Sequence, residues 1–214
     1  MLFLDSAVRD DVAPLLATGL FDGVTTNPKV LDQAGVRAED VPAFYAWARE
    51  QGAGTVFVQA TGRDVVELRR TSAAILELGD AVRVKLVATT AGLTVARELA
   101  DAGHEVLVTA VYHPAQGLAA MAAGARYLAP YVGRAGDAGR DGTALVAQLA
   151  RIVAAAGSDL RILAASLRGA DAVADASAAG AHDVTISVPV ARELLDDTLT
   201  HVAADEFERL AVGA

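Results

Sequence analysis

The sequence predicts a closed barrel of eight parallel strands, each followed by a helix, with one additional C-terminal helix. Two observations predict it. Short apolar runs of strand length alternate eight times with amphipathic stretches of helix length across the 214 residues. Many helical stretches also end on a glycine, the residue favoured directly after a helix: Gly19, Gly52, Gly79, Gly103, Gly124, Gly157 and Gly180. No linker divides the chain, so residues 1–214 are expected to form a single (β/α)8 domain, a TIM barrel.

The expected elements follow one another at regular intervals. Strands are expected at 2–4, 23–25, 55–59, 83–87, 105–109, 127–129, 161–165 and 184–187. Helices are expected at 8–18, 41–51, 63–78, 91–102, 114–123, 143–156, 170–179 and 190–195, and a last one at about 199–210. The glycine-rich segment 133–142, GRAGDAGRDG, is expected to be a flexible loop, either a plain surface connection or one that closes on a ligand. The alternative fold is an open doubly wound sheet, which usually has a glycine-rich loop after its first strand, and this chain has Asp5-Ser-Ala-Val there.

Composition and charge exclude several classes of protein. The net charge of −9 argues against a nucleic-acid binder, which needs a basic face. No apolar run approaches the ~18 residues of a membrane helix, and the first residues read as a strand rather than a signal peptide. Cysteine is absent and no HExxH-like pair occurs, so no metal site is expected. A cytoplasmic location fits this composition.

Polar residues end seven consecutive expected strands, which in a parallel barrel is the end that carries the chemistry. In chain order they are Asp5, then Thr25, Thr26 and Asn27, then Gln59, Lys85, Thr109, Tyr131 with Arg134, and Ser166 with Arg168. Their convergence predicts a site at one mouth of the barrel. Each also has a structural interpretation: Asp5 and Ser166 could be helix N-caps, and Asn27-Pro28 could be a plain turn before a helix.

Lys85 is the most informative of these residues because Val84 and Leu86 flank it in an apolar strand. Side chains alternate along a strand, so Lys85 points into the barrel if its two neighbours face the helices. A poorly solvated ammonium has a lowered pKa, and the neutral amine can form an imine with a carbonyl group. The alternative is a lysine that reaches solvent at the strand end. Arg83, on the same face, weakens the Schiff-base hypothesis and is expected at the opposite rim.

Five motifs together resemble the transaldolase family, and within it the small fructose-6-phosphate aldolase-like branch. They are GVTTNP at 23–28, VKL at 84–86, TAVYHPAQG at 109–117, APYVGR at 129–134 and LAAS at 163–166. The resemblance covers nearly the whole chain, from FLDS at 3–6 to the last helix. It implies a (β/α)8 barrel that acts in carbohydrate metabolism, in or near the pentose phosphate pathway. It also implies that Lys85 forms the covalent Schiff base, without a metal or other cofactor.

The resemblance also implies roles for the other residues at the strand ends. Asp5 matches the proton-transfer carboxylate, Asn27 a donor to a substrate hydroxyl, and Gln59, Thr109 and Tyr131 the surroundings of the catalytic water. Arg134 and Ser166 match the phosphate site, and Thr26 and Arg168 are further candidates for substrate binding. Members of this size form pentamers, often stacked into decamers, so the helix at 199–210 is expected to pack on a neighbouring subunit.

Two positions separate the branches of the family. True transaldolases resemble one another in having Glu at the position of Gln59 and Phe at that of Tyr131, so this pairing implies the aldolase branch. A tyrosine hydroxyl can protonate the enamine through water and release free ketone. The expected reaction is cleavage of a ketose phosphate, with fructose 6-phosphate as the expected substrate, to dihydroxyacetone and glyceraldehyde 3-phosphate.

Three alternatives remain open: a transaldolase, a catalytically inactive barrel that serves as a scaffold, and a phosphate-binding isomerase. The sequence also departs from the pattern of the family in places that bear on the substrate. Lys29 stands where a small hydroxyl residue is usual, and Gly133 matches the transaldolase form. Ala135-Gly136 replaces the common Ile-Asp, and Leu167-Arg168 stands where Phe is usual before the basic residue. The departures at Lys29 and in 135–142 lie where the distal end of a sugar phosphate is expected to rest.

Overall fold

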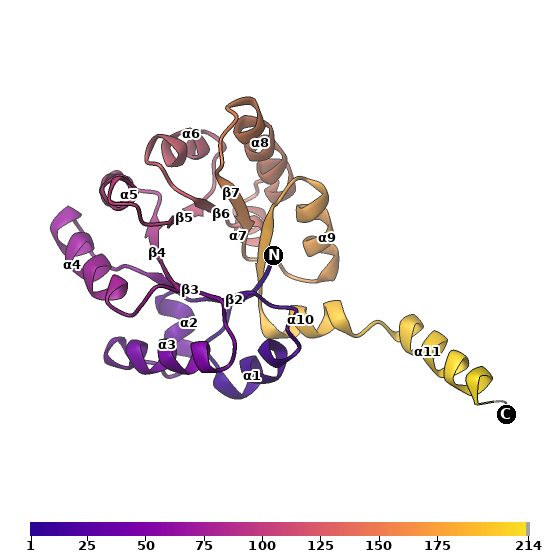
Figure 1. Cartoon of the computed structure of the whole chain (residues 1–214). Coiled ribbons are helices and arrows are strands. Elements are labelled where there is room, and N and C mark those ends of the chain that lie inside the picture. Colours follow the sequence, from indigo (N-terminus) through magenta and orange to yellow (C-terminus); the bar gives the residue numbers. More distant parts are fainter. Residues whose placement is uncertain (213–214) are drawn as a thin grey trace.

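The computed structural model describes residues 1–212 and confirms the predicted barrel (Figure 1). The eight strands are parallel and pair in chain order, and β8 pairs with β1 to close the ring. They are β1 (Leu2–Leu4), β2 (Gly23–Thr25), β3 (Thr55–Gln59), β4 (Val82–Val87), β5 (Val106–Val111), β6 (Tyr127–Pro130), β7 (Arg161–Ala164) and β8 (Asp183–Ile186). Their carboxyl ends therefore meet at one mouth.

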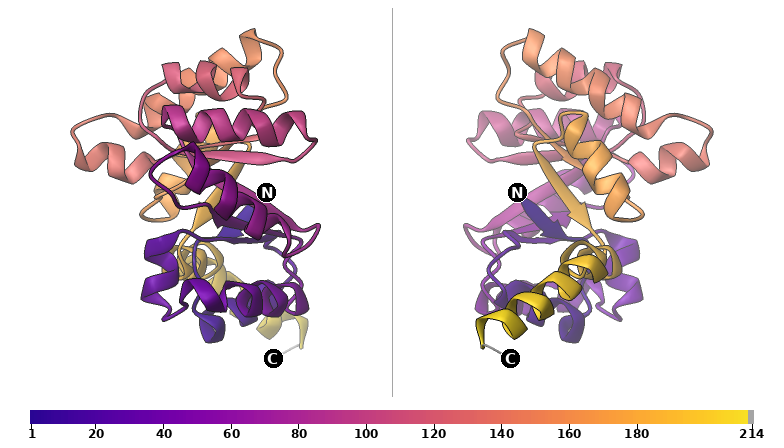
Figure 2. Two further views of the ribbon diagram at one scale, coloured as in Figure 1. Left: turned by 90° about the vertical axis from the view of Figure 1, so that its left-hand side faces the viewer. Right: turned by 90° about the vertical axis from the view of Figure 1, so that its right-hand side faces the viewer.

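Helices surround the strands, as the views in Figures 1 and 2 show. They are α1 (Arg9–Ala17), α2 (Pro28–Gln33), α3 (Val41–Glu50), α4 (Val65–Leu76), α5 (Thr90–Asp101), α6 (Ala115–Ala122), α7 (Val132–Asp137), α8 (Gly142–Ala155), α9 (Ala170–Ala178), α10 (Val188–Leu195) and α11 (Thr198–Ala211), with a short 3-10 helix, η1 (Ala38–Asp40). The seven glycines expected after helices all have φ between +58° and +138°, a conformation that favours glycine.

Two helices lie outside the expected set. α2 begins at Pro28, and the side chain of Asn27 caps it by accepting hydrogen bonds from the amides of Lys29 and Val30. α7 occupies the first part of the segment 133–142, so the expectation that this whole segment is a flexible loop is wrong. The amides of Val132 and Gly133, at the start of α7, donate to carbonyls after β7, which fixes this short helix against its neighbour.

The apolar core has two parts, separated by the wall of the barrel. The outer part lies between strands and helices and contains Val84 and Leu86. The inner part fills the barrel, where the rings of Phe3 and Tyr127 each pack edge-to-face on Phe57, with centroids 5.4 and 5.2 Å apart. Since Val84 and Leu86 face the helices, strand alternation directs Lys85 into the barrel, as predicted.

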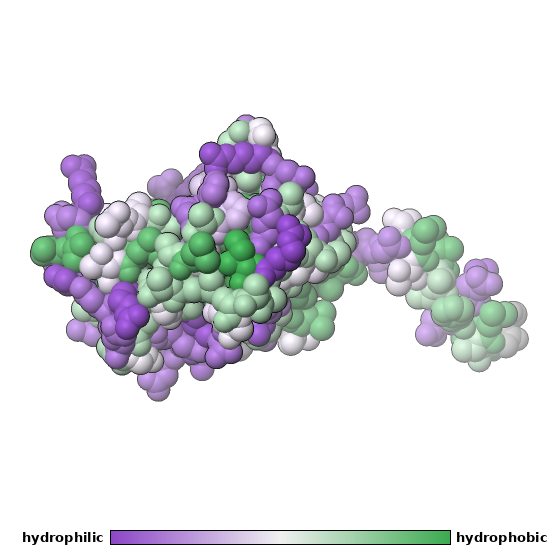
Figure 3. All heavy atoms as spheres, turned by 90° about the horizontal axis from the view of Figure 1, so that it is seen from above, coloured by the Kyte–Doolittle hydropathy of each residue, from purple (hydrophilic) through white to green (hydrophobic). Residues whose placement is uncertain are grey.

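α11 leaves the barrel and makes no buried contact with it. Figures 1 and 2 show it projecting beyond α10, and Figure 3 shows apolar atoms gathered on it. Four of its apolar side chains, Leu199, Val202, Phe207 and Leu210, are between 58% and 78% exposed. No helix within residues 1–212 is both long and apolar enough to cross a membrane.

Candidate active site

Lys85 lines a cavity of about 70 Å³ in the mouth of the barrel. Its side chain is 4% exposed, and it makes no ion pair or hydrogen bond within residues 1–212. Burial lowers the pKa of its amine; the carboxylate of Asp5 opposes this effect, and the cation of Arg134 adds to it. The fold therefore favours the neutral, nucleophilic form of this lysine more than water would.

Asp5 is held in place by two threonine hydroxyls. The Oγ1 of Thr25 donates to Oδ1 of Asp5 at 2.7 Å, and Oγ1 of Thr185 lies 2.6 Å from Oγ1 of Thr25. Both threonines are buried and line the same cavity as Lys85. This chain of hydroxyls keeps a carboxylate beside the amine. The residue before α1 is Val8, so Asp5 is not the N-cap of that helix.

Tyr131 and Thr109 form a second polar pair at the mouth. The Oγ1 of Thr109 donates to the phenolic oxygen of Tyr131 at 3.2 Å, and both side chains are buried. Burial raises the pKa of Tyr131, so its phenol stays protonated and able to donate at neutral pH. The guanidinium of Arg134 lies over the ring, 4.9 Å from its centroid, and joins Tyr131 in the wall of the cavity.

Backbone strain is concentrated beside this pair. Ala110 and Ser166 are the residues other than glycine that have positive φ within the described chain, at +58° and +62°. Ala110 lies at an irregularity in the pairing of β5 with β6, directly after Thr109. Ser166 lines the cavity and follows β7. Strained residues of this kind cluster at functional sites, because the surrounding structure must hold them there.

Asn27 also lines the cavity, and its side chain caps a helix. Its Oδ1 accepts from the amides of Lys29 and Val30, at 3.0 and 3.1 Å, and so serves as the N-cap of α2. The Nδ2 group makes no hydrogen bond within residues 1–212. Asn27 lines the same cavity as Lys85, and an amide donor that the cap leaves free suits a substrate hydroxyl.

Comparison with known proteins places this arrangement in a family. The model of the transaldolase/fructose-6-phosphate aldolase family matches residues 2–212. The chain belongs to this family. A probable transaldolase of Anaeromyxobacter dehalogenans is 34% identical over 205 residues, 96% of this chain and 93% of the relative. A probable transaldolase of Prosthecochloris aestuarii is 32% identical over 210 residues, 96% of this chain and 94% of the relative.

Membership of the transaldolase/fructose-6-phosphate aldolase family makes this barrel a member of an enzyme family. The structure brings six of the predicted residues to the wall of one cavity: Asp5, Asn27, Lys85, Tyr131, Arg134 and Ser166. Thr109 joins them through Tyr131. One polar wall residue, Thr185, was not among the predicted set, and Thr25 was predicted only as a polar strand end, without a role of its own. Their signal is a polar residue at an inward position of an otherwise apolar strand.

Three predicted residues lie apart from the wall of the cavity. Thr26 is buried and donates to the carbonyl of Phe57 at 2.9 Å, which is a structural role. Arg168 is exposed and forms a two-pronged ion pair with Asp137. Gln59 pairs in register with Lys85 but lines a different, larger pocket. Ser166, although in the cavity, is not a helix N-cap, because Gly169 precedes α9.

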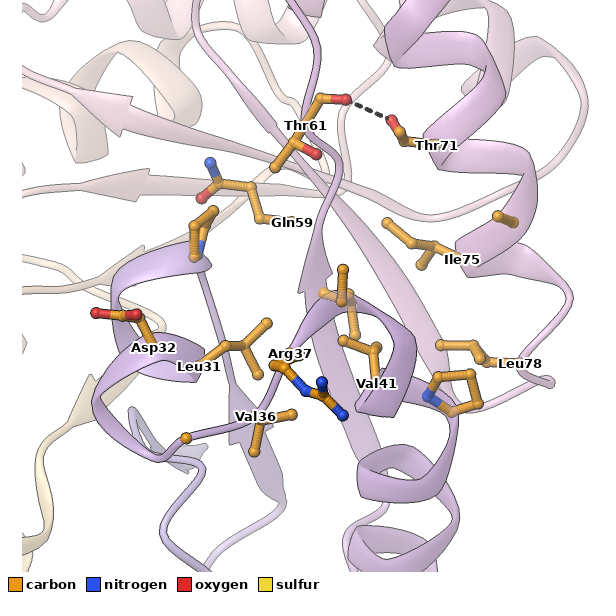
Figure 4. Close-up of a pocket in the computed structure, with 16 residues that line it drawn as sticks. Leu31, Asp32, Val36, Arg37, Val41, Gln59, Thr61, Thr71, Ile75 and Leu78 are labelled. Atoms are coloured by element: carbon orange, nitrogen blue, oxygen red, sulfur yellow. Dashed lines mark hydrogen bonds between the residues drawn. The ribbon is translucent and has the colours of Figure 1, made fainter.

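The larger pocket, of about 510 Å³, lies outside the barrel wall between α2, α3 and α4 (Figure 4). Figure 4 shows apolar side chains around it, among them Leu31, Val36, Val41, Ile75 and Leu78. Gln59 and Thr61 mark its end nearest the mouth, where Thr71 donates to the carbonyl of Thr61 at 2.9 Å. The chemical groups of the site are therefore in the small cavity, and this groove is mainly apolar.

Proposed function

We propose that the chain is a class I aldolase in which Lys85 forms a Schiff base with a ketose phosphate. The substrate that fits best is fructose 6-phosphate, which is cleaved to dihydroxyacetone and glyceraldehyde 3-phosphate. The observation that carries the proposal is the buried, unpaired amine of Lys85 in one cavity with Asp5 and Tyr131. A strand lysine with only a structural role would reach solvent or an acidic partner instead.

The covalent step begins when the neutral amine of Lys85 adds to C2 of the ketose. The resulting carbinolamine loses water and becomes an iminium, with Asp5 placed beside the amine to move protons. The C4 hydroxyl then gives up its proton, and the C3–C4 bond breaks. Its electron pair goes to the iminium, which leaves an enamine on Lys85 and frees glyceraldehyde 3-phosphate.

The enamine then needs a proton at C3, and Tyr131 is placed to supply it through a water molecule. Its raised pKa keeps the phenol protonated, and Thr109 fixes its direction. Over the whole cycle, one proton moves from the C4 oxygen to C3. Hydrolysis of the iminium then releases dihydroxyacetone and the free amine of Lys85. Arg134 and Ser166 at the edge of the cavity suit the phosphate.

The second candidate is a transaldolase that passes the dihydroxyacetone unit to another sugar phosphate, and the names of the curated relatives favour it. An assay with and without acceptor aldehyde separates the two. We expect wild type to release free dihydroxyacetone from fructose 6-phosphate without erythrose 4-phosphate. Turnover that strictly depends on the acceptor would refute the aldolase and support the transaldolase, and no turnover in either case would favour an inactive barrel.

We also propose that the chain forms a homo-oligomeric ring, a pentamer or a stacked decamer, in which α11 packs on a neighbouring copy. The exposed apolar side chains of α11 need a cover, and their own barrel does not provide it. The apolar groove of Figure 4 lies on the side of the barrel opposite α11 (Figure 1). Head-to-tail docking of α11 into this groove joins two different faces, and such contacts form a ring when the rotation from one copy to the next closes.

Light scattering after gel filtration tests this proposal. Phe207→Glu together with Leu210→Glu is expected to give monomers, because two charges would be buried in an apolar groove. Glu208→Lys is the matched control, a charged change on the same helix that leaves the apolar side chains intact. A wild-type monomer, or an unchanged oligomer in the double variant, would contradict the proposal.

A further inference from the structure

The ion pair between Arg168 and Asp137 lies directly beside the proposed phosphate site. Nη1 of Arg168 is 2.7 Å from Oδ1 of Asp137, and Nη2 contacts Oδ2. Asp137 is the last residue of α7, and Arg134 lies three residues earlier on the same helix. Residues three apart on a helix are neighbours, so Asp137 is within reach of Arg134. Arg168 is the cation that pairs with this carboxylate within the described residues, while the guanidinium of Arg134 lies over the ring of Tyr131.

The backbone is shaped to bring Arg168 to that carboxylate. A Cβ atom at Gly133 would lie 3.0 Å from Nε and 3.2 Å from Cγ of Arg168, so the arginine side chain passes across Gly133 to reach Asp137. The amide of Gly133 also donates to the carbonyl of Ser166 at 2.9 Å, which fixes the start of α7 against the segment that carries Arg168. Glycine at this position is what lets the two segments approach so closely.

The pair contributes little to stability by itself. The side chains of Arg168 and Asp137 are 58% and 53% exposed, and ion pairs exposed to this degree are weak. Its consequence is electrostatic. The hydrogen bond from Arg168 lowers the pKa of Asp137 most, and Arg134 lowers it further, so the carboxylate stays charged and interacts with both cations.

We propose that Arg168 is a positioning residue that neutralises Asp137 and thereby leaves Arg134 free for a phosphate group. This inference rests on the proposed function, and it reassigns Arg168 from direct substrate binding. Without Arg168, Asp137 pairs with Arg134 along α7 and places an uncompensated negative charge next to the phosphate. Both effects weaken binding of a phosphorylated substrate, and neither touches the covalent chemistry at Lys85.

Four proteins test the inference: wild type, Arg168→Gln, Asp137→Asn and the double variant. The substrates are glyceraldehyde 3-phosphate and unphosphorylated glyceraldehyde, each in aldol addition to dihydroxyacetone. We expect Arg168→Gln to raise KM for the phosphorylated aldehyde about three- to tenfold at low salt, with kcat and the glyceraldehyde reaction unchanged. Asp137→Asn alone is expected to keep the wild-type KM or lower it, and the double variant to recover it.

Other outcomes would overturn the inference in recognisable ways. If Arg168 contacts the phosphate itself, the double variant stays as impaired as Arg168→Gln. If the pair merely fastens α7, Asp137→Asn is impaired as well, for both aldehydes and with a lower Tm. Titration with inorganic phosphate by calorimetry, with Arg134→Ala as the negative control, gives the same ranking of the four proteins without turnover. That readout separates failure of this inference from failure of the proposed reaction.

Discussion

Replacement of Tyr131 by Phe tests how the proposed enzyme releases its product. The change removes one oxygen and its hydrogen bond with Thr109, 3.2 Å long, while the ring keeps its place under the guanidinium of Arg134. Loss of one such bond costs about 1 kcal/mol of stability, so the variant should fold. A positioned general acid contributes about 100- to 10,000-fold to a proton transfer. Release of free dihydroxyacetone should therefore fall at least about 100-fold.

Cleavage and transfer should respond differently from release, because the enamine still forms on Lys85. With erythrose 4-phosphate present, the variant is expected to pass the dihydroxyacetone unit on at a rate within several-fold of wild type. Tyr112→Phe is the matched control, since that ring packs edge-to-face on Tyr131 with centroids 5.7 Å apart. Equal loss of release and transfer in Tyr131→Phe, or release at the wild-type rate, would refute the role of the phenol.

Two further predictions concern Lys85 and Gly133. Burial lowers the pKa of Lys85 in the folded chain below 10.5, the value of an exposed amine. Between the lowered pKa and pH 10.5 the unfolded chain therefore binds more protons than the folded chain, and the free energy of unfolding rises with pH in that range. Lys85→Met should therefore be more stable than wild type at pH 7, by about 1.4 kcal/mol for each unit by which the pKa is lowered. Chemical denaturation at a series of pH values should show this gain in stability shrinking towards pH 10.5. A gain that does not change with pH would contradict a lowered pKa. Gly133→Ala should place a Cβ atom 2.2 Å from the carbonyl oxygen of Ser166 and so displace α7. We expect a lower Tm by calorimetry and a higher KM for the ketose phosphate. Gly136→Ala is the control, because no other atom lies within 4 Å of the Cβ position there.

The sequence predicted the barrel and most of the wall of the cavity because both depend on patterns within single strands and helices. Strand alternation alone directs Lys85 inward once Val84 and Leu86 face the helices. Asp5 and Tyr131 were predicted because they end strands, and parallel strands end at one mouth. The family motifs then assigned roles that no pattern of burial could supply.

The misses depend on contacts between segments far apart in the chain. Thr185 was missed and Thr25 was given no role of its own, because threonine is an ordinary strand residue. Only the contact of 2.6 Å between their hydroxyls, together with the hydrogen bond from Thr25, makes them a support of Asp5. α7 contains two glycines, which disfavour helix, but carbonyls after β7 accept from its first amides. Arg168 was predicted to bind substrate because it follows a strand end. Its actual partner, Asp137, lies on another segment, so the sequence alone does not show the ion pair.

Borohydride reduction in the presence of fructose 6-phosphate tests the central claim most directly. The chain contains two lysines, Lys85 and Lys29, and Lys29 is exposed, so the protein carries its own internal control. Peptide mass spectrometry should find one reduced dihydroxyacetone unit on the peptide of Lys85, none on that of Lys29, and none in Lys85→Ala. An unmodified Lys85 in an enzyme that turns over ketose phosphate, or equal labelling of both lysines, would contradict the Schiff-base mechanism.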